Sequence, residues 1–407
     1  MPFFRFLKDN GRWLAAGALL TLISSFGQTF FISIFAGQIR AEFDLGHGAW
    51  GGIYSLGTTL SAVVMVWAGG LTDVMRVRHL GALVMVGLAL AALSMAFVSA
   101  VWALPFVIFA LRLTGQGMIS HIATVAMARW FVAARGKALA VASLGFAFGE
   151  ALLPIVTVAL MGIVYWRTLW VVAAVITLLM IPVLMRLLKS ERTPASVASE
   201  SPSAGMGGRH WARRDTLGHW LFWMMVPALL APSAFVTALF FQQVHLAEVK
   251  GWSHAALVAL IPAYTFTSVG AAMVFGWLID RFGSARLMPF YQLPLAAGFV
   301  LFSLSETLLG AGIALAVMAL TQGGQSTLSS AFWAEFYGTR HLGAIKAMAA
   351  GIMVLGSAAG PAITGALIDA GINFDAQMVW IAAYILGASA LVGVAIARAR
   401  KTLPAAF

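Results

Sequence analysis

Long apolar segments recur along almost the whole chain, and they constrain its fold more than any other feature. Each is near the roughly 20 residues that a helix needs to cross a bilayer core about 30 Å thick. Of the 407 residues, 61% are hydrophobic and only 10% are charged, whereas soluble domains carry about 25% charged residues. The sequence therefore predicts an all-α polytopic membrane protein with twelve transmembrane helices. The predicted spans are residues 13–39, 48–70, 79–100, 103–130, 138–160, 167–188, 218–244, 254–278, 287–305, 308–335, 344–368 and 377–397.

The basic residues predict the orientation of these spans. With the N-terminus in the cytoplasm, 21 of the 25 Lys and Arg residues fall on the cytoplasmic side, and only Arg40, Arg167 and Lys250 fall outside. Such an excess is typical of cytoplasmic loops. We therefore expect a multi-pass protein of the bacterial inner membrane with both termini in the cytoplasm. The same topology explains the net charge of +11 without a nucleic-acid partner.

A polar segment divides the chain into two halves. Residues 189–217 are mostly Ser, Pro, Gly and charged residues, a composition that does not pack a core. We expect this segment to be a cytoplasmic linker. It would join an N-terminal six-helix bundle, residues 1–188, to a C-terminal six-helix bundle, residues 218–407.

Short patterns in the two halves recur at a nearly constant offset. The segment Gly69–Asp73 follows the second span, and Gly276–Asp280 follows the eighth span 207 residues later. The pair Gly145-x-x-x-Gly149 in the fifth span recurs as Gly356-x-x-x-Gly360 in the eleventh, 211 residues later. Such offsets indicate an internal duplication, and the glycine spacing predicts close helix contacts.

Two charges lie inside neighbouring apolar segments, Arg112 in the fourth span and Glu150 in the fifth. A charge in hydrocarbon costs roughly 2.5 to 3.5 kcal/mol on insertion scales. At a rise of about 1.5 Å per residue, both side chains lie about 12 Å from the outer surface, so they can pair between antiparallel helices. Two interpretations are open, a structural ion pair and a site for a proton or a substrate anion.

The twelve spans, the central linker and the paired loops resemble the major facilitator superfamily of secondary transporters. The most specific match is Gly276-x-x-x-Asp280-Arg281-x-Gly283-x-x-Arg286, which is similar to the superfamily's cytoplasmic loop signature. The copy in the first half is degenerate, because Val74 replaces the expected Arg and the following Gly is absent. The resemblance implies a conformational latch between the halves, formed by Asp73, Arg76, Arg78, Asp280, Arg281 and Arg286.

The segment Arg112–Gly117 resembles the family's fourth-helix motif, in which an Arg is followed closely by Gln and Gly. Here Gln116 and Gly117 are displaced by one position. The resemblance implies that Arg112 takes part in proton coupling. In the fifth span, Gly149-Glu150 replaces the Gly-Pro of the family's antiporter signature, which argues against a drug/proton antiporter.

The end of the seventh span, Phe241–Ser253, resembles the monocarboxylate and oxalate/formate porters. Eukaryotic monocarboxylate carriers also place an Asp and an Arg in the eighth span. The matching stretch here, Ile261–Gly270, carries no charge, so a lactate-type mechanism on the eighth span is not supported.

In this architecture a substrate lies near the bilayer midplane between the halves. Polar side chains at that depth are candidates to bind it, although Ser and Thr commonly bond to their own backbone and membrane aromatics mostly pack. An amide in hydrocarbon needs a partner, which favours the glutamines. The predicted substrate-binding residues are Gln28, Tyr54, Arg112, Gln116, Tyr264, Gln322 and Gln325, and the predicted proton-coupling residues are Glu150 and Arg112.

The sequence contains no cysteine, no metalloprotease or phosphate-binding motif and no nucleophile elbow. We therefore expect no enzyme, no cofactor and no metal. The prediction is a monomeric secondary transporter for a small organic anion such as a carboxylate, working by alternating access. If Glu150 neutralises Arg112 at rest, protonation of Glu150 would free Arg112 for the substrate. The alternatives are export of apolar or cationic compounds recognised by Glu150, and a non-transporting membrane sensor on the same fold.

Overall fold

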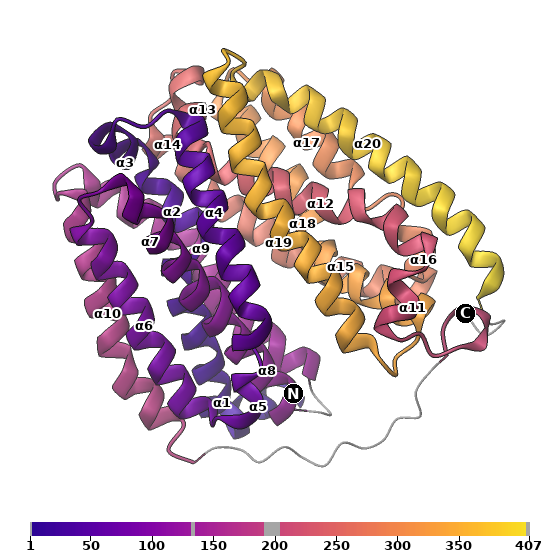
Figure 1. Ribbon diagram of the computed structural model, residues 1–407. Helices are drawn as coiled ribbons and strands as arrows, with labels where there is room; N and C mark the ends of the chain where they lie inside the picture. Colours follow the sequence, from indigo (N-terminus) through magenta and orange to yellow (C-terminus); the bar gives the residue numbers. More distant parts are fainter. Residues whose placement is uncertain (1, 132–134, 191–203, 404–407) are drawn as a thin grey trace. The chain divides into compact units, whose positions relative to one another are not determined.

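The computed structural model describes residues 2–131, 135–190 and 204–403, and every regular element in these ranges is a helix (Figure 1). Helices follow from the apolar sequence, because hydrocarbon offers the backbone no partners outside the chain. Within the described ranges, ten helices are long and apolar enough to span a membrane, and a bent pair brings the number to eleven. The ninth predicted span is the shorter helix α17 (Leu293–Leu304), of 12 residues. The predicted all-α polytopic fold is confirmed.

The chain forms two compact units, Met1–Ala198 and Ser199–Phe407. Unit 1 contains most of the irregular helical turns. Its elements are α1 (Pro2–Ser24), η1 (Ser25–Gly27), α2 (Thr29–Ile32), η2 (Ser33–Phe35), α3 (Ala36–Phe43), α4 (His47–Ala68), α5 (Leu71–Val74), α6 (Val77–Phe97), η3 (Val101–Ala103), α7 (Leu104–Leu111), η4 (Arg112–Ile119), α8 (Ser120–Trp130), α9 (Arg135–Met161) and α10 (Trp166–Leu187).

Unit 2 is built mainly of long helices, with short ones at their ends. Its elements are η6 (Met206–Gly208), α11 (Arg213–Leu217), α12 (Trp220–Phe241), α13 (Gln243–Lys250), α14 (His254–Val258), α15 (Ile261–Phe282), α16 (Ser284–Leu287), α17 (Leu293–Leu304), α18 (Leu308–Tyr337), α19 (Leu342–Asp369), α20 (Phe374–Ala399) and η7 (Arg400–Thr402).

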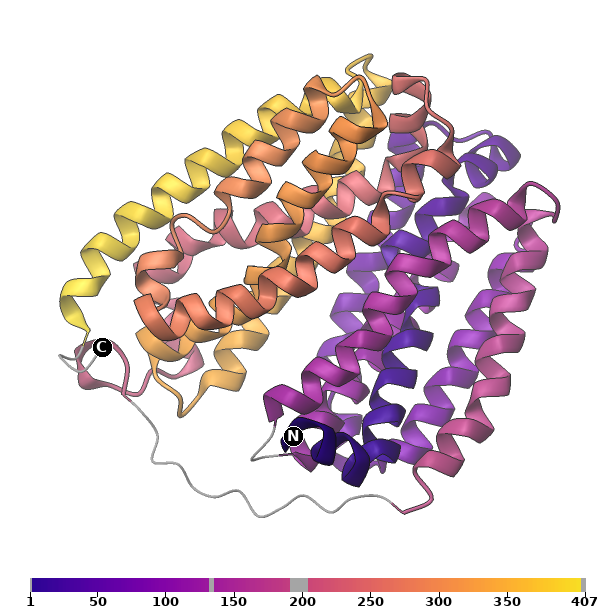
Figure 2. The same ribbon diagram turned by 180° about the vertical axis from the view of Figure 1, so that it is seen from behind.

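Helix pairings recur between the units. In unit 1, α1 packs on α9, α4 on α7, and α6 on α10. In unit 2, α12 packs on α19, α15 on α18, and α17 on α20 (Figure 2). These pairs occupy matching places in the order of the spans, so the internal duplication seen in the sequence extends to the packing.

The repeated glycines lie in the closest of these contacts. A methyl group at Gly145 in α9 would overlap the Ala18 carbonyl of α1, and one at Gly360 in α19 would overlap the Ala234 carbonyl of α12. Next to the first contact, the Thr21 hydroxyl donates to the Ala142 carbonyl at 2.5 Å. The predicted close helix contacts are therefore present in both units.

Part of the predicted linker is folded. Residues 191–203 lie outside the described residues, but residues 204–217 pack on unit 2. Met206 is 3% exposed in a cluster with Phe222 and Trp333, and the Trp211 backbone N–H donates to the Tyr337 carbonyl at 3.3 Å. The prediction that this stretch does not pack a core was wrong, because two large apolar side chains in a polar sequence are enough to anchor it.

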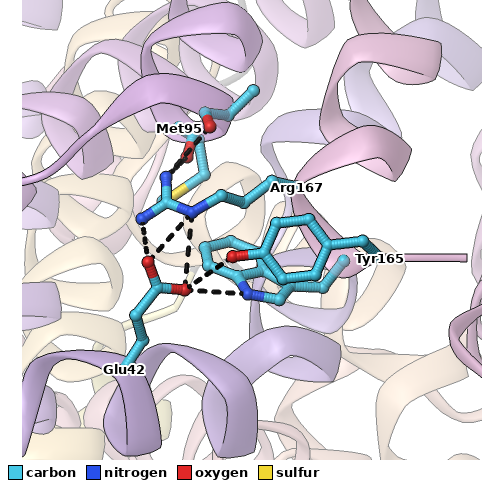
Figure 3. A network of polar contacts seen from close by, with 6 residues as sticks. Glu42, Met95, Tyr165 and Arg167 are labelled. Atoms are coloured by element: carbon cyan, nitrogen blue, oxygen red, sulfur yellow. Dashed lines mark hydrogen bonds and ion pairs between the residues drawn. The ribbon is translucent and has the colours of Figure 1, made fainter.

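A polar network ties three helices of unit 1 together (Figure 3). The Arg167 guanidinium donates to both Glu42 oxygens, with contacts of 2.5 and 3.1 Å to Oε1 and 3.4 Å to Oε2, and to the carbonyls of Met95 and Ala96 at the end of α6. The Tyr165 hydroxyl donates to Glu42 at 3.2 Å. Arg167 is a predicted outside residue, so this network fastens α3, α6 and α10 at the predicted outer end.

Candidate functional site

The first span is interrupted where the site begins. The tight turn η1 ends at Gly27, and Gln28 has an extended backbone, with φ −85° and ψ 155°. The two helical parts meet at 43°. A membrane span tolerates such a break only where protein or water meets its backbone. Gln28 and Thr29 follow the break directly, so they lie on a bent part of the span.

The fourth span contains a wide turn that packs on this break. Residues Arg112–Ile119 form the π-helix η4 between α7 and α8. A methyl group at Gly115 would lie 2.6 Å from the Gly27 Cα atom. The Thr114 hydroxyl donates to the Ala110 carbonyl at 2.6 Å, which provides this carbonyl with a partner beside the irregular turn. A wide turn of one span therefore fits against a tight turn of another.

Arg112 is buried at this contact. Its side chain is 2% exposed, and Nη1 donates to the Thr29 hydroxyl at 3.1 Å. The Thr29 hydroxyl lies 2.6 Å from the Tyr54 hydroxyl, and the Tyr54 ring centroid is 5.4 Å from Arg112 Cζ, within the range of a cation–π interaction. Arg112 Nε is buried without a hydrogen-bond partner among the described residues. The first and second spans thus surround this cation of the fourth span with hydroxyls and an aromatic ring.

Among the ion pairs of the described residues, the predicted pair between Arg112 and Glu150 does not occur. The side chain of Arg112 contacts Thr29 of α2 and Tyr54 of α4, whereas Glu150 lies half-buried on α9. The depth argument placed both charges at one level but did not fix the direction around each helix axis.

An open groove of about 540 Å³, lined by both apolar and polar side chains, follows one turn along the fourth span. Gln28 Nε2 donates to the Ser120 hydroxyl across it at 3.5 Å, a long contact, and Gln116 Oε1 is buried without a hydrogen-bond partner among the described residues. Two of the predicted binding glutamines therefore share one groove, and amide groups there can still accept and donate. The lining residues are Thr21, Gln28, Gln116, Ser120, Thr124, Leu139, Ala142, Ser143 and Phe146.

The predicted binding residues of unit 2 do not form a comparable cluster. Tyr264 is 1% exposed, and its ring packs against Phe240 with the centroids 5.4 Å apart. Gln322 is exposed and Gln325 half-buried on α18. On the same polar stretch, the Thr321 hydroxyl bridges the Tyr291 carbonyl and the Leu295 N–H. This hydroxyl therefore joins α18 to the start of α17, and a role of Tyr264, Gln322 and Gln325 in substrate binding stays a prediction.

The predicted latch residues lie after α4 in the first half, and at the end of α15 and in α16 in the second. Asp280, Arg281 and Arg286 are exposed and line a cavity of about 510 Å³. In the degenerate copy, Arg76 is exposed and Arg78 half-buried, and the side chain of Asp73 lies outside the described residues. Their role as a latch stays a prediction.

Three polar residues with structural contacts at these places were not predicted. Thr29 is the hydrogen-bond partner of Arg112. Its position directly after Gln28, a predicted binding residue, could have marked it as a candidate. Glu335 accepts hydrogen bonds from the backbone N–H and the hydroxyl of Ser284 beside the second loop. Arg129 donates to the Thr72 carbonyl at 2.6 Å beside the first loop. Nothing in the sequence marks the last two, because their partners are distant in the chain.

Comparison with known proteins identifies the family. The family model of the Major Facilitator Superfamily matches residues 17–271 and 243–406. A bacterial homologue of the human lysosomal transporter Spinster, in its inward-facing and unoccupied conformation, has a similar structure, with a TM-score of 0.77 at 15% identity over 98% of this chain and 99% of that one. A point mutant of the nucleoside transporter NupG has a TM-score of 0.70 at 12% identity over 95% of this chain and 99% of that one.

A comparison with curated protein sequences finds no significant match. At these identities the similar structures establish the fold alone, whereas the family model covers nearly the whole chain in two copies. The chain therefore belongs to the major facilitator superfamily, and it is a multi-pass membrane protein that acts as a secondary transporter and not as an enzyme.

Proposed function

We propose that this transporter moves a small organic anion, such as a carboxylate, and that Arg112 binds the anionic group. The observation that carries this proposal is the buried guanidinium of Arg112, which meets hydroxyls and an aromatic ring but no carboxylate among the described residues. An uncompensated charge in a membrane interior is costly and is found at substrate and ion pathways. A substrate carboxylate would supply the missing countercharge.

The chemistry of the guanidinium suits this role. It carries five N–H donors in a planar fork that matches a carboxylate. The protein's own hydrogen bond, to Thr29, starts from Nη1, and Nε has no partner among the described residues. The nearby groove adds Gln28 and Gln116, whose amides can hydrogen-bond to the rest of a small polar solute.

The test is uptake into proteoliposomes of a panel of labelled small carboxylates, each paired with its uncharged amide. We expect carboxylates to be taken up and the amides to be excluded, because only the anion compensates Arg112. Uptake of cationic or apolar solutes without carboxylate uptake would overturn the proposal and favour an exporter of such compounds.

We further propose that Glu150 carries the coupling proton. Glu150 lies on the same stripe of α9 as the groove-lining residues Phe146 and Leu139, at spacings of four and eleven residues, which places the three on one helix face. Because Arg112 does not pair with Glu150, this proposal does not require protonation to release the guanidinium.

Replacing Glu150 with Gln is expected to abolish proton-driven accumulation while substrate exchange across the membrane continues. Gln keeps the shape of the side chain but cannot exchange a proton, so only the coupled step is lost. The measurement compares gradient-driven uptake with counterflow at zero gradient in the same vesicles. Full gradient-driven accumulation by the Gln variant would exclude Glu150 as the coupling site.

The remaining assignments rest on the sequence. The excess of basic residues on one side supports a bacterial inner-membrane protein with cytoplasmic termini. We also propose a monomer as the working unit, with the lipid bilayer, the solute and the proton as its partners.

A further inference from the structure

The π-helix η4 is the only one in the described part of the chain, and it lies at the residue that the proposed function depends on. Its counterpart in the duplicated half, α18, is α-helical from Leu308 to Tyr337. The two units share their helix pairings, so folding into this architecture does not itself require a wide turn. π-Turns inside α-helices are frequent at functional sites.

A π-turn absorbs an extra residue. Its i→i+5 hydrogen bonds enclose one residue more than the i→i+4 bonds of an α-helix, so the helices on either side keep their direction around the axis.

The width of the turn has a specific use in the structure. It brings Gly115 against Gly27, where even a methyl group would lie 2.6 Å from the opposite Cα atom. Gly27 ends the tight turn η1, and Thr29 begins the next helix two residues later. The hydroxyl of Thr29 then meets both Arg112 and Tyr54, at 3.1 and 2.6 Å.

We propose that the extra residue in η4 is a positioning insertion. It widens the fourth span until Gly115 supports the break of the first span, and this support holds the Thr29 hydroxyl against Arg112. The insertion acts through Thr29 and does not touch the substrate. The proposal rests on the proposed function in that Arg112 is taken to bind the carboxylate.

The test is deletion of Leu113, a half-buried residue inside η4. The deletion removes one residue from the wide turn and should convert it to regular α-helix with both flanks in register. The matched control is deletion of Val125, a half-buried apolar residue in the α-helical part of the same span. That deletion rotates everything after it by about 100°.

We expect the Leu113 deletion to yield folded protein with a thermal midpoint near wild type, whereas the Val125 deletion misfolds. The apparent KM for the carboxylate should rise roughly tenfold or more, the scale of a lost hydrogen bond to a charged group. Thr29→Val should raise KM by a similar factor, and combining it with the Leu113 deletion should add little, because both changes remove the same contact.

Each other result overturns the inference. If the Leu113 deletion misfolds like the control, the turn is not an insertion. If it folds and keeps the wild-type KM, or if its effect multiplies with that of Thr29→Val, the insertion does not act through Thr29. If the wild-type protein transports no carboxylate, the proposed function is refuted, and the positioning role with it. The thermal midpoints of the two deletion variants still decide whether the turn holds an extra residue.

Discussion

Replacing Arg112 with Ala is expected to abolish uptake of the organic anion while leaving the protein folded. The guanidinium is 2% exposed and has no carboxylate partner among the described residues, so its removal takes away a costly buried charge. The free energy of unfolding should therefore stay the same or rise. Uptake should fall by about 100-fold or more, since the binding charge itself is lost.

Arg112→Lys separates charge from geometry in the same experiment. Lysine keeps the cation but loses the planar fork that binds a carboxylate with two parallel hydrogen bonds, so we expect uptake to stay far below wild type. Initial rates in proteoliposomes and thermal midpoints in detergent measure the two effects. Arg5→Ala controls for the change in net charge, because the side chain of Arg5 is 86% exposed. Uptake by Arg112→Ala within about twofold of wild type would remove this residue from the binding site.

The second large effect concerns the glycines of the duplicated helix pairs. Gly360→Ala is expected to destabilise unit 2, because the added methyl group meets the Ala234 carbonyl, and backbone cannot turn away as a side chain can. Overpacking of this kind costs about 1 to 3 kcal/mol, and occasionally more. Gly145→Ala should destabilise unit 1 in the same way through the Ala18 carbonyl.

Each of these variants has a control in its own helix. Gly351 in α19 and Gly136 in α9 have no atom within 4 Å of an added methyl group, so alanine at either position should be neutral or slightly stabilising. The yield of monodisperse protein and its thermal midpoint give the measurement. Equal behaviour of Gly360→Ala and Gly351→Ala would show that the close contact does not determine stability.

The fold could be predicted from the sequence because hydropathy alone decides which segments can lie in a bilayer. Spans such as 344–368 and 377–397 agree with α19 (Leu342–Asp369) and α20 (Phe374–Ala399) to within about three residues. The glycine pairs gave the helix contacts correctly as well, since small residues at four-residue spacing leave only one face for close approach.

The site could be predicted only in part. Gln28, Tyr54, Arg112 and Gln116 do lie in neighbouring parts of unit 1, because polar groups at one depth are costly anywhere else. The π-helix could not be foreseen, since apolarity does not encode the hydrogen-bond register of a helix. The ion pair with Glu150 was predicted from depth, and depth says nothing about the direction in which a side chain leaves its helix.

The prediction that the linker does not pack a core failed for a different reason. Composition averaged over residues 189–217 is polar, yet Met206 is 3% exposed in the core of unit 2. Averages over a segment miss single anchoring residues. Glu335 and Arg129 were missed likewise, because each bonds to a residue more than 50 positions away.

The uninterrupted α-helix α18, compared with the irregular fourth span, gives this chain a reference within itself. Two copies of one ancestral pattern both contain close glycine contacts between the same pair of spans, but the wide turn and the buried cation occur in one copy only among the residues that the structure describes. Features present in both copies are those that folding requires. A feature present in only one copy can instead contribute to solute binding. We therefore expect random mutations at features shared by both copies to impair insertion into the membrane. Mutations at features found in one copy only should change which solute is transported.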